Sequence, residues 1–139
     1  ISVTLTQAGF SIRDVQKALK ALALTDVAPT FNNLNDTVEG SIALLRQFSI
    51  NAGQLEGALG SINAVAGKFA VESEDIIFAL RRTGAAFKAA GGNMEELIGL
   101  FTSVRATTRE SAETIATGLR TIFTRIRRPR TVQFLKQLL

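Results

Sequence analysis

The sequence lacks four side chains that carry much of protein chemistry, since it has no cysteine, histidine, tryptophan or tyrosine. Without cysteine the chain forms no disulfide and offers no thiolate to a metal. Without histidine it lacks the usual general base, the commonest metal ligand and every Ser–His arrangement. We therefore expect a protein that is not an enzyme, with no catalytic residue, no metal site and no cofactor.

Proline is scarce as well, with two residues in 139, and no apolar run approaches the roughly 18 residues that cross a bilayer. Leucine, alanine and isoleucine are abundant, which favours helices throughout. The length suits one domain with a sizeable core. Because the chain begins at Ile1 rather than methionine and stops within an apolar pattern at Leu139, we interpret residues 1–139 as a single helical domain, a fragment of a longer chain.

Four short segments have the pattern of corners between helices, and they are centred on Ser11, Asn51, Ser73 and Asn93. A Ser or Asn at such a position accepts a free backbone N–H of the next helix, and a residue three positions on can reach back to it. Gln54 and Glu96 stand at that offset from Asn51 and Asn93. The opening segment ends at Gly9, which we interpret as the stop of a first helix.

Between the corners, apolar residues recur at steps of three and four, which predicts helices. Pro29 suits the first turn of a helix that runs to about Phe48, with Thr25 or Asp26 near its cap. The last apolar stripe is predicted to face the core and consists of Ile115, Leu119, Ile122, Phe123 and Ile126. The sequence thus predicts an all-α fold, an orthogonal multi-helix bundle of six or seven helices.

Small residues recur on one face of the helix that follows Asn51, at Gly53, Gly57, Gly60, Ala64 and Gly67. In a membrane such a row lets two helices approach closely. The flanking charges Glu56 and Lys68 argue against a bilayer, so we expect a close helix crossing inside a soluble core.

Charge is distributed unevenly along the chain. Residues 1–113 hold ten Lys and Arg against twelve acids, a net charge of −2, whereas residues 114–139 hold six Lys and Arg and no acid. The candidate contact surface consists of Arg120, Arg125, Arg127, Arg128 and Arg130. One interpretation is a patch for nucleic acid or an acidic protein. The other, which we favour, is that Arg125, Arg127 and Arg128 complement the dipole at a helix end before Pro129.

Acidic residues cluster at Glu72–Asp75, Glu95–Glu96 and Glu110–Glu113. Paired carboxylates can serve as general acid and base. All three clusters fall in the first turn of a predicted helix, where acids are favoured electrostatically. We therefore expect them to stabilise helix ends.

Three segments together resemble the core region of tail tape measure proteins of tailed phages, residues 5–19, 62–104 and 110–129. The last of them, ESAETIATGLRTIFTRIRRP, carries the most characteristic helix, with matches at Ser111, Glu113, Leu119, Arg120, Phe123 and Arg125. The resemblance covers about residues 4–135 and rests on the order and spacing of the segments.

The resemblance implies a structural protein of phage tail assembly that takes part in tail-length determination and aids genome delivery, and that acts by protein–protein contacts rather than catalysis. Its expected partners are the tail tube, the tail tip or assembly chaperones. Its expected location is the tail lumen of the virion, and the bacterial host cytoplasm during assembly. Two alternatives stay open: a basic helical module that contacts nucleic acid, and a cell-wall hydrolase segment, for which no acid or metal site is visible.

Overall fold

The computed structural model describes residues 1–139 and contains helices joined by turns, with no strand. The α-helices are α1 (Ser2–Gln7), α2 (Ile12–Thr25), α3 (Leu34–Gln47), α4 (Leu55–Phe69), α5 (Ser73–Ala89), α6 (Met94–Thr108), α7 (Ala112–Ile126) and α8 (Pro129–Leu138), with a short 3-10 helix η1 (Ala52–Gln54) before α4. The prediction of an all-α fold is confirmed, with eight helices in place of six or seven. The additional helix is α8, and Pro129 suits its first position because no helical hydrogen bond needs that N–H.

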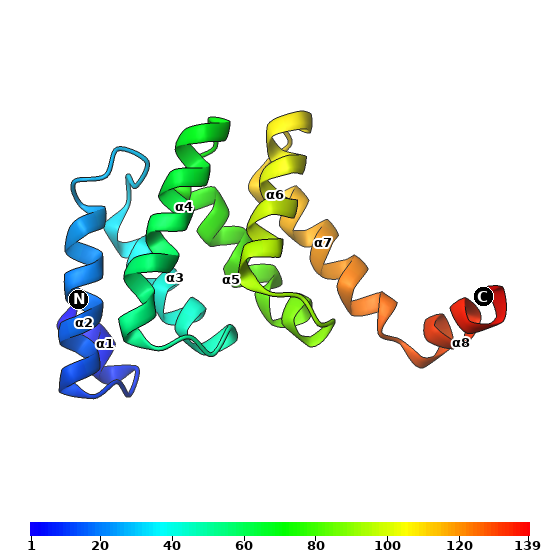
Figure 1. Ribbon diagram of the computed structural model, residues 1–139, viewed down its shortest axis with the longest axis horizontal. Coiled ribbons are helices and arrows are strands. Elements are labelled where there is room, and N and C mark those ends of the chain that lie inside the picture. The colour runs from blue at the N-terminus through cyan, green and yellow to red at the C-terminus, as the bar shows by residue number, and fades with distance from the viewer.

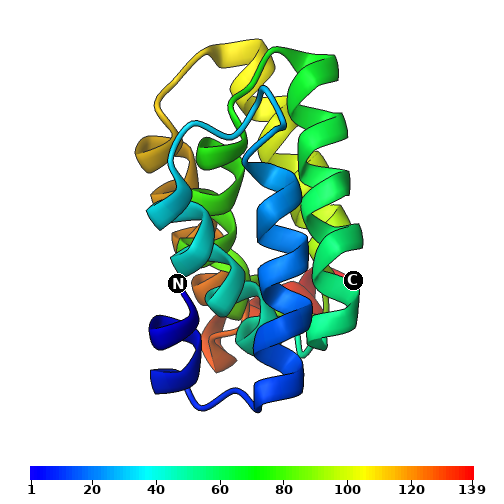
Figure 2. The same ribbon diagram turned by 90° about the vertical axis from the view of Figure 1, so that its left-hand side faces the viewer.

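The helices form two layers that lie against each other (Figures 1 and 2). One layer contains α3, α5 and α7, and the other contains α2, α4 and α6. Helix α5 is central, because it packs against α3 and α7 within its layer and against α4 and α6 across the layers. Neighbouring helices of a layer lie side by side, and the arrangement is compatible with the helical bundle expected from the sequence (Figure 1).

The core fills the space between the layers as one continuous apolar cluster, from Leu5 of α1 to Leu119 of α7. Its largest fully buried side chains include Leu22, Leu44, Leu55, Ile62, Ile76, Leu80, Leu97 and Phe101. Each such burial stabilises the fold by about 1.5–3 kcal/mol relative to an exposed side chain. Phe69, at the end of α4, is 45% exposed.

Helices α3 and α5 pack tightly at two glycines, Gly40 of α3 and Gly84 of α5, where there is no room for a side chain. A Cβ atom at Gly40 would lie 2.0 Å from Cγ2 of Ile77, and one at Gly84 would lie 2.9 Å from Cε2 of Phe48. The close crossing expected on α4 is wrong, because a Cβ atom at Gly57, Gly60 or Gly67 would meet nothing within 4 Å. The glycines of α4 face outward, and the tight contact lies in the other layer.

Three of the four predicted corners are confirmed. Ser11 accepts the N–H of Asp14, and both Asn51 and Asn93 form reciprocal capping boxes with the residue three positions on. The fourth cap is wrong, because the cap position before α5 is Glu72. The hydroxyl of Ser73 is buried and lies 2.7 Å from Oγ1 of Thr30 instead.

The predicted start of the third helix near Pro29 is also wrong, since α3 begins at Leu34 with Asn33 as its cap. The carboxylate of Glu74 accepts the backbone N–H groups of Asn32 and Asn33, which holds the segment before α3 in a turn. The first helix is confirmed as α1, and Gly9 follows it with φ at +91°.

The apolar stripe of α7 is only partly buried. Ile115 and Leu119 lie in the core, as predicted, but Ile122 is 56% exposed and Ile126 is 44% exposed. No further helix covers this side of α7, because α8 turns away at the end of the row and buries none of its side chains (Figure 1). None of the helices has the length and apolar character that a bilayer span requires.

Candidate basic groove on α5 and α7

Helix α7 has a polar face opposite its apolar stripe, formed by arginines and threonines at steps of three and four. The helix begins at Ser111, whose hydroxyl accepts the N–H of Thr114, and its axis is fixed by packing against α5. With Arg82 of α5, this face lines a hollow of about 340 Å³ whose other lining residues are Thr117, Arg120, Thr121, Thr124, Arg125 and Arg128. No apolar side chain lines this hollow.

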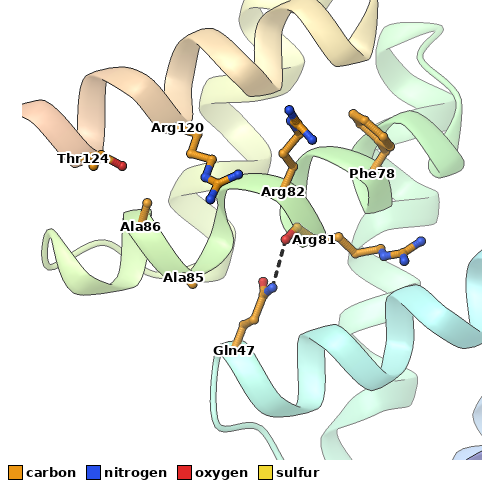
Figure 3. A pocket seen from close by; sticks show the side chains of 8 residues that line it. All are labelled: Gln47, Phe78, Arg81, Arg82, Ala85, Ala86, Arg120 and Thr124. Carbon is orange, nitrogen blue, oxygen red and sulfur yellow. Dashed lines mark hydrogen bonds between the residues drawn. The ribbon is translucent and has the colours of Figure 1, made fainter.

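A second hollow of about 590 Å³ adjoins the first, because Arg82, Arg120 and Thr124 line both. It runs over α5 between α3 and α7, and Figure 3 shows Gln47 on one side of α5 with Arg120 and Thr124 on the other. Its remaining lining residues are Phe78, Arg81, Ala85 and Ala86. We call the two adjoining hollows together the α5–α7 groove.

The arginines of the groove have no acidic partner in the chain. The one ion pair of the structure joins Nε of Arg105 to Oδ2 of Asp75 at 3.3 Å, and neither residue lines the groove. Within the groove, Nε of Arg82 donates to Oγ1 of Thr117 at 3.0 Å, and Nε2 of Gln47 donates to the backbone oxygen of Arg81 at 2.9 Å. The groove therefore presents guanidinium donors and threonine hydroxyls that suit an anionic ligand.

The structure brings together three of the five arginines named from the sequence. Arg120, Arg125 and Arg128 line the groove, whereas Arg127 and Arg130 are exposed and line neither hollow. Arg125 lies in the last turn of α7 and Arg127 at its C-cap, as expected for cations that complement a helix dipole. Arg128 instead occupies the cap position before α8.

Sequence reasoning missed Arg81 and Arg82, which come from α5. The adjacent arginines are a visible signal, since they follow Leu80 of the buried stripe and are exposed. The sequence does not say, however, that α5 and α7 lie side by side. Only that packing places Arg82 beside Arg120.

The acidic clusters have structural roles. Glu96 accepts the N–H of Asn93, and Glu74 accepts two backbone N–H groups ahead of α3. Asp75 pairs with Arg105 and so joins α5 to α6. The predicted first-turn position is confirmed for Glu74, Asp75, Glu95, Glu96 and Glu113, whereas Glu72 is the N-cap of α5 and Glu110 precedes the cap of α7. The contacts that Glu74 and Asp75 make with neighbouring elements were not predicted.

Residues 1–138 match the family of phage-related minor tail proteins, and the chain belongs to this family. No solved structure matches the chain. Membership indicates a role in the structure of a phage tail, in contact with other phage tail proteins.

Proposed function

We propose that this chain is a compact helical module of a tail tape measure protein, a structural and non-enzymatic component that acts by protein–protein contacts. The observation that carries the proposal is the family match over residues 1–138. The motif-bearing segment around α7, from Ser111 to Arg125, supports the narrower assignment to a tape measure chain. We further propose that residues 1–139 are one domain of that longer chain.

The fold suggests how such a module would contribute to tail-length determination. Its longest helix, α5, has 17 residues, and a helix of that length spans only about 26 Å. Stacked helices of this size do not form an extended ruler, so the module serves as a docking unit on the chain that sets the length. Its proposed partners are the tail tube, the tail tip or assembly chaperones, in the host cytoplasm during assembly and in the tail lumen afterwards.

The proposal is tested by deleting residues 1–139 in frame from the phage gene that encodes them and measuring tails by electron microscopy. A docking unit should be required for assembly, so we expect few or no complete tails. A helical spacer would instead give intact tails shortened by roughly 210 Å, the length of 139 residues in one continuous helix. The substitution Gly60→Ala, on an exposed face, serves as the matched control and should leave tails normal. Normal tails after the deletion would contradict the proposal.

A further inference from the structure

We infer that the α5–α7 groove binds an acidic polypeptide segment, one that presents carboxylates along a helix of a partner protein. The inference rests on the proposed role in protein–protein contacts and names the chemistry of the contact. The feature that carries it is a row of arginines on α5 and α7 with no carboxylate partner in the chain.

The dimensions of the groove suit a helix. Its α7 side extends from Thr117 to Arg125, which corresponds to about 12 Å or just over two helical turns, and Arg128 follows just beyond the end of α7. Arg120, Arg125 and Arg128 recur along it at steps of three to five residues, so carboxylates one turn apart on a partner helix can reach successive guanidinium groups. Arginine pairs with carboxylates through two parallel hydrogen bonds, which gives such a contact both strength and direction.

The floor of the groove favours a polypeptide over a nucleic acid backbone. Ala85 and Ala86 of α5 line it together with Phe78, which is 37% exposed (Figure 3). Apolar side chains of a partner helix can be buried on this floor, whereas a chain of phosphates gains nothing from it. Phe78 is also the one aromatic ring in the groove, so there is no series of rings on which single-stranded bases could stack.

Acidic side chains beyond Phe78 also disfavour a nucleic acid backbone in the groove. Phe78 also lines a neighbouring hollow together with the acidic side chains of Asp36, Glu74, Asp75 and Glu113. A nucleic acid backbone that continued along α5 past Phe78 would meet these carboxylates, which repel it. A short acidic helix that lies along Thr117 to Arg125 ends before it reaches these carboxylates.

A second copy of this chain is a poorer occupant. The neighbouring acidic hollow would have to neutralise the arginines, but Glu74 is engaged by the backbone N–H groups before α3 and Asp75 by Arg105. Two free carboxylates, those of Asp36 and Glu113, remain in that hollow against the five arginines of the groove. We therefore take an acidic segment of another protein as the occupant, and the test below has a second copy as one of its outcomes.

The test measures binding of the purified chain to synthetic probes by fluorescence anisotropy. The probe is a labelled helical peptide of about 12 residues with Glu at three- and four-residue steps. Its control has Gln in place of each Glu, and a duplex DNA of similar length is the nucleic acid probe. We expect the Glu peptide to bind at about 150 mM salt, where long-range attraction is largely screened, and the Gln peptide not to bind.

Two double variants distinguish binding in the groove from a general effect of net charge. Arg82→Gln with Arg120→Gln should weaken binding of the Glu peptide about tenfold or more, because it removes charge-assisted hydrogen bonds in the groove. Arg127→Gln with Arg130→Gln changes net charge equally but lies outside the groove, and should change affinity less than about twofold. If the first pair unfolds by circular dichroism, Arg120→Gln with Arg125→Gln replaces it.

Three results would overturn the inference. Equal losses in the two pairs of variants would show that the peptide responds to net charge alone. Tighter binding of duplex DNA than of the Glu peptide at the same salt, lost only in the groove variant, would assign the groove to nucleic acid. A dimer in light scattering that dissociates in the groove variant would assign it to a second copy. These measurements use the isolated chain, whereas the proposed role in the tail is tested in phage. A negative result for the groove is therefore distinguishable from a negative result for the role in the tail.

Discussion

Phe87 of α5 and Phe123 of α7 meet edge to face, with their ring centroids 4.7 Å apart and their planes at 66°. Phe87 is buried and Phe123 is half-buried, so the pair marks the place where the core reaches the uncovered side of α7. One turn before Phe123, Leu119 of α7 is buried in the core, and one turn after it Ile126 is 44% exposed. The aromatic pair therefore supports the helix that carries most of the basic groove.

Replacement of Phe123 by alanine should lower the free energy of unfolding by about 2 kcal/mol, less than the 3–5 kcal/mol of a fully buried phenylalanine. Its neighbour Ile122 is 56% exposed, and Ile122→Ala is the matched control with an expected change within about 0.5 kcal/mol. Urea unfolding followed by circular dichroism measures both. Equal losses in the two variants would contradict the different burial of the two side chains.

Local signals in the sequence predicted much of the fold. The caps at Ser11, Asn51 and Asn93 depend on residues three positions apart, and the stripes depend on spacing within one helix. These interactions are short in range, so periodicity and side-chain chemistry are enough to recognise them.

The errors arise where a distant residue or a missing neighbour decides the outcome. Pro29 is a good first residue for a helix, but Glu74 engages the backbone just before Leu34 and delays the start of α3. Ile122 and Ile126 have the spacing of core residues, yet they are 56% and 44% exposed. The sequence predicted the arginines of α7 but not those of α5 for the same reason. Arg82 lies beside Arg120 only because α5 packs on α7.

The glycines of the two layers should respond oppositely to alanine. Gly40→Ala should destabilise the protein by about 1–3 kcal/mol, because its Cβ would overlap Ile77, which is 1% exposed and has no room to move. Gly60→Ala adds a methyl group in open space within α4 and should stabilise by roughly 0.5–1 kcal/mol through helix propensity. Denaturant midpoints measure both, and a stabilising Gly40→Ala would contradict the close approach of α3 and α5.

The capping box of α6 should contribute measurably to stability. Asn93 accepts the N–H of Glu96 at 2.9 Å, and its own N–H donates to the Glu96 carboxylate at 3.0 Å. Asn93→Ala should cost about 1 kcal/mol, whereas Asn93→Asp should cost much less because aspartate caps a helix equally well. Glu95→Ala, beside the box but outside it, is the control and should lose only the smaller interaction of its carboxylate with the helix dipole. Thermal unfolding compares the three, and a loss in Asn93→Asp equal to that in Asn93→Ala would mean that capping is not the cause.

Duplex DNA should bind this chain weakly, without sequence preference and with a steep dependence on salt. The exposed cations of the C-terminal region are Arg120, Arg125, Arg127, Arg128, Arg130 and Lys136. If about four of them replace counterions on the phosphates, affinity should fall roughly 100-fold or more between about 50 and 200 mM salt.

Titration of labelled duplexes of different sequence at both salt concentrations measures this fall. Because every exposed cation contributes to such binding, Arg127→Gln with Arg130→Gln should weaken it as much as Arg82→Gln with Arg120→Gln does, unlike the peptide experiment. A module that reads DNA would keep its sequence discrimination at the higher salt, since contacts to base edges survive screening better than contacts to phosphates. Sequence-selective binding at that salt would therefore contradict a protein-binding role for the α5–α7 groove.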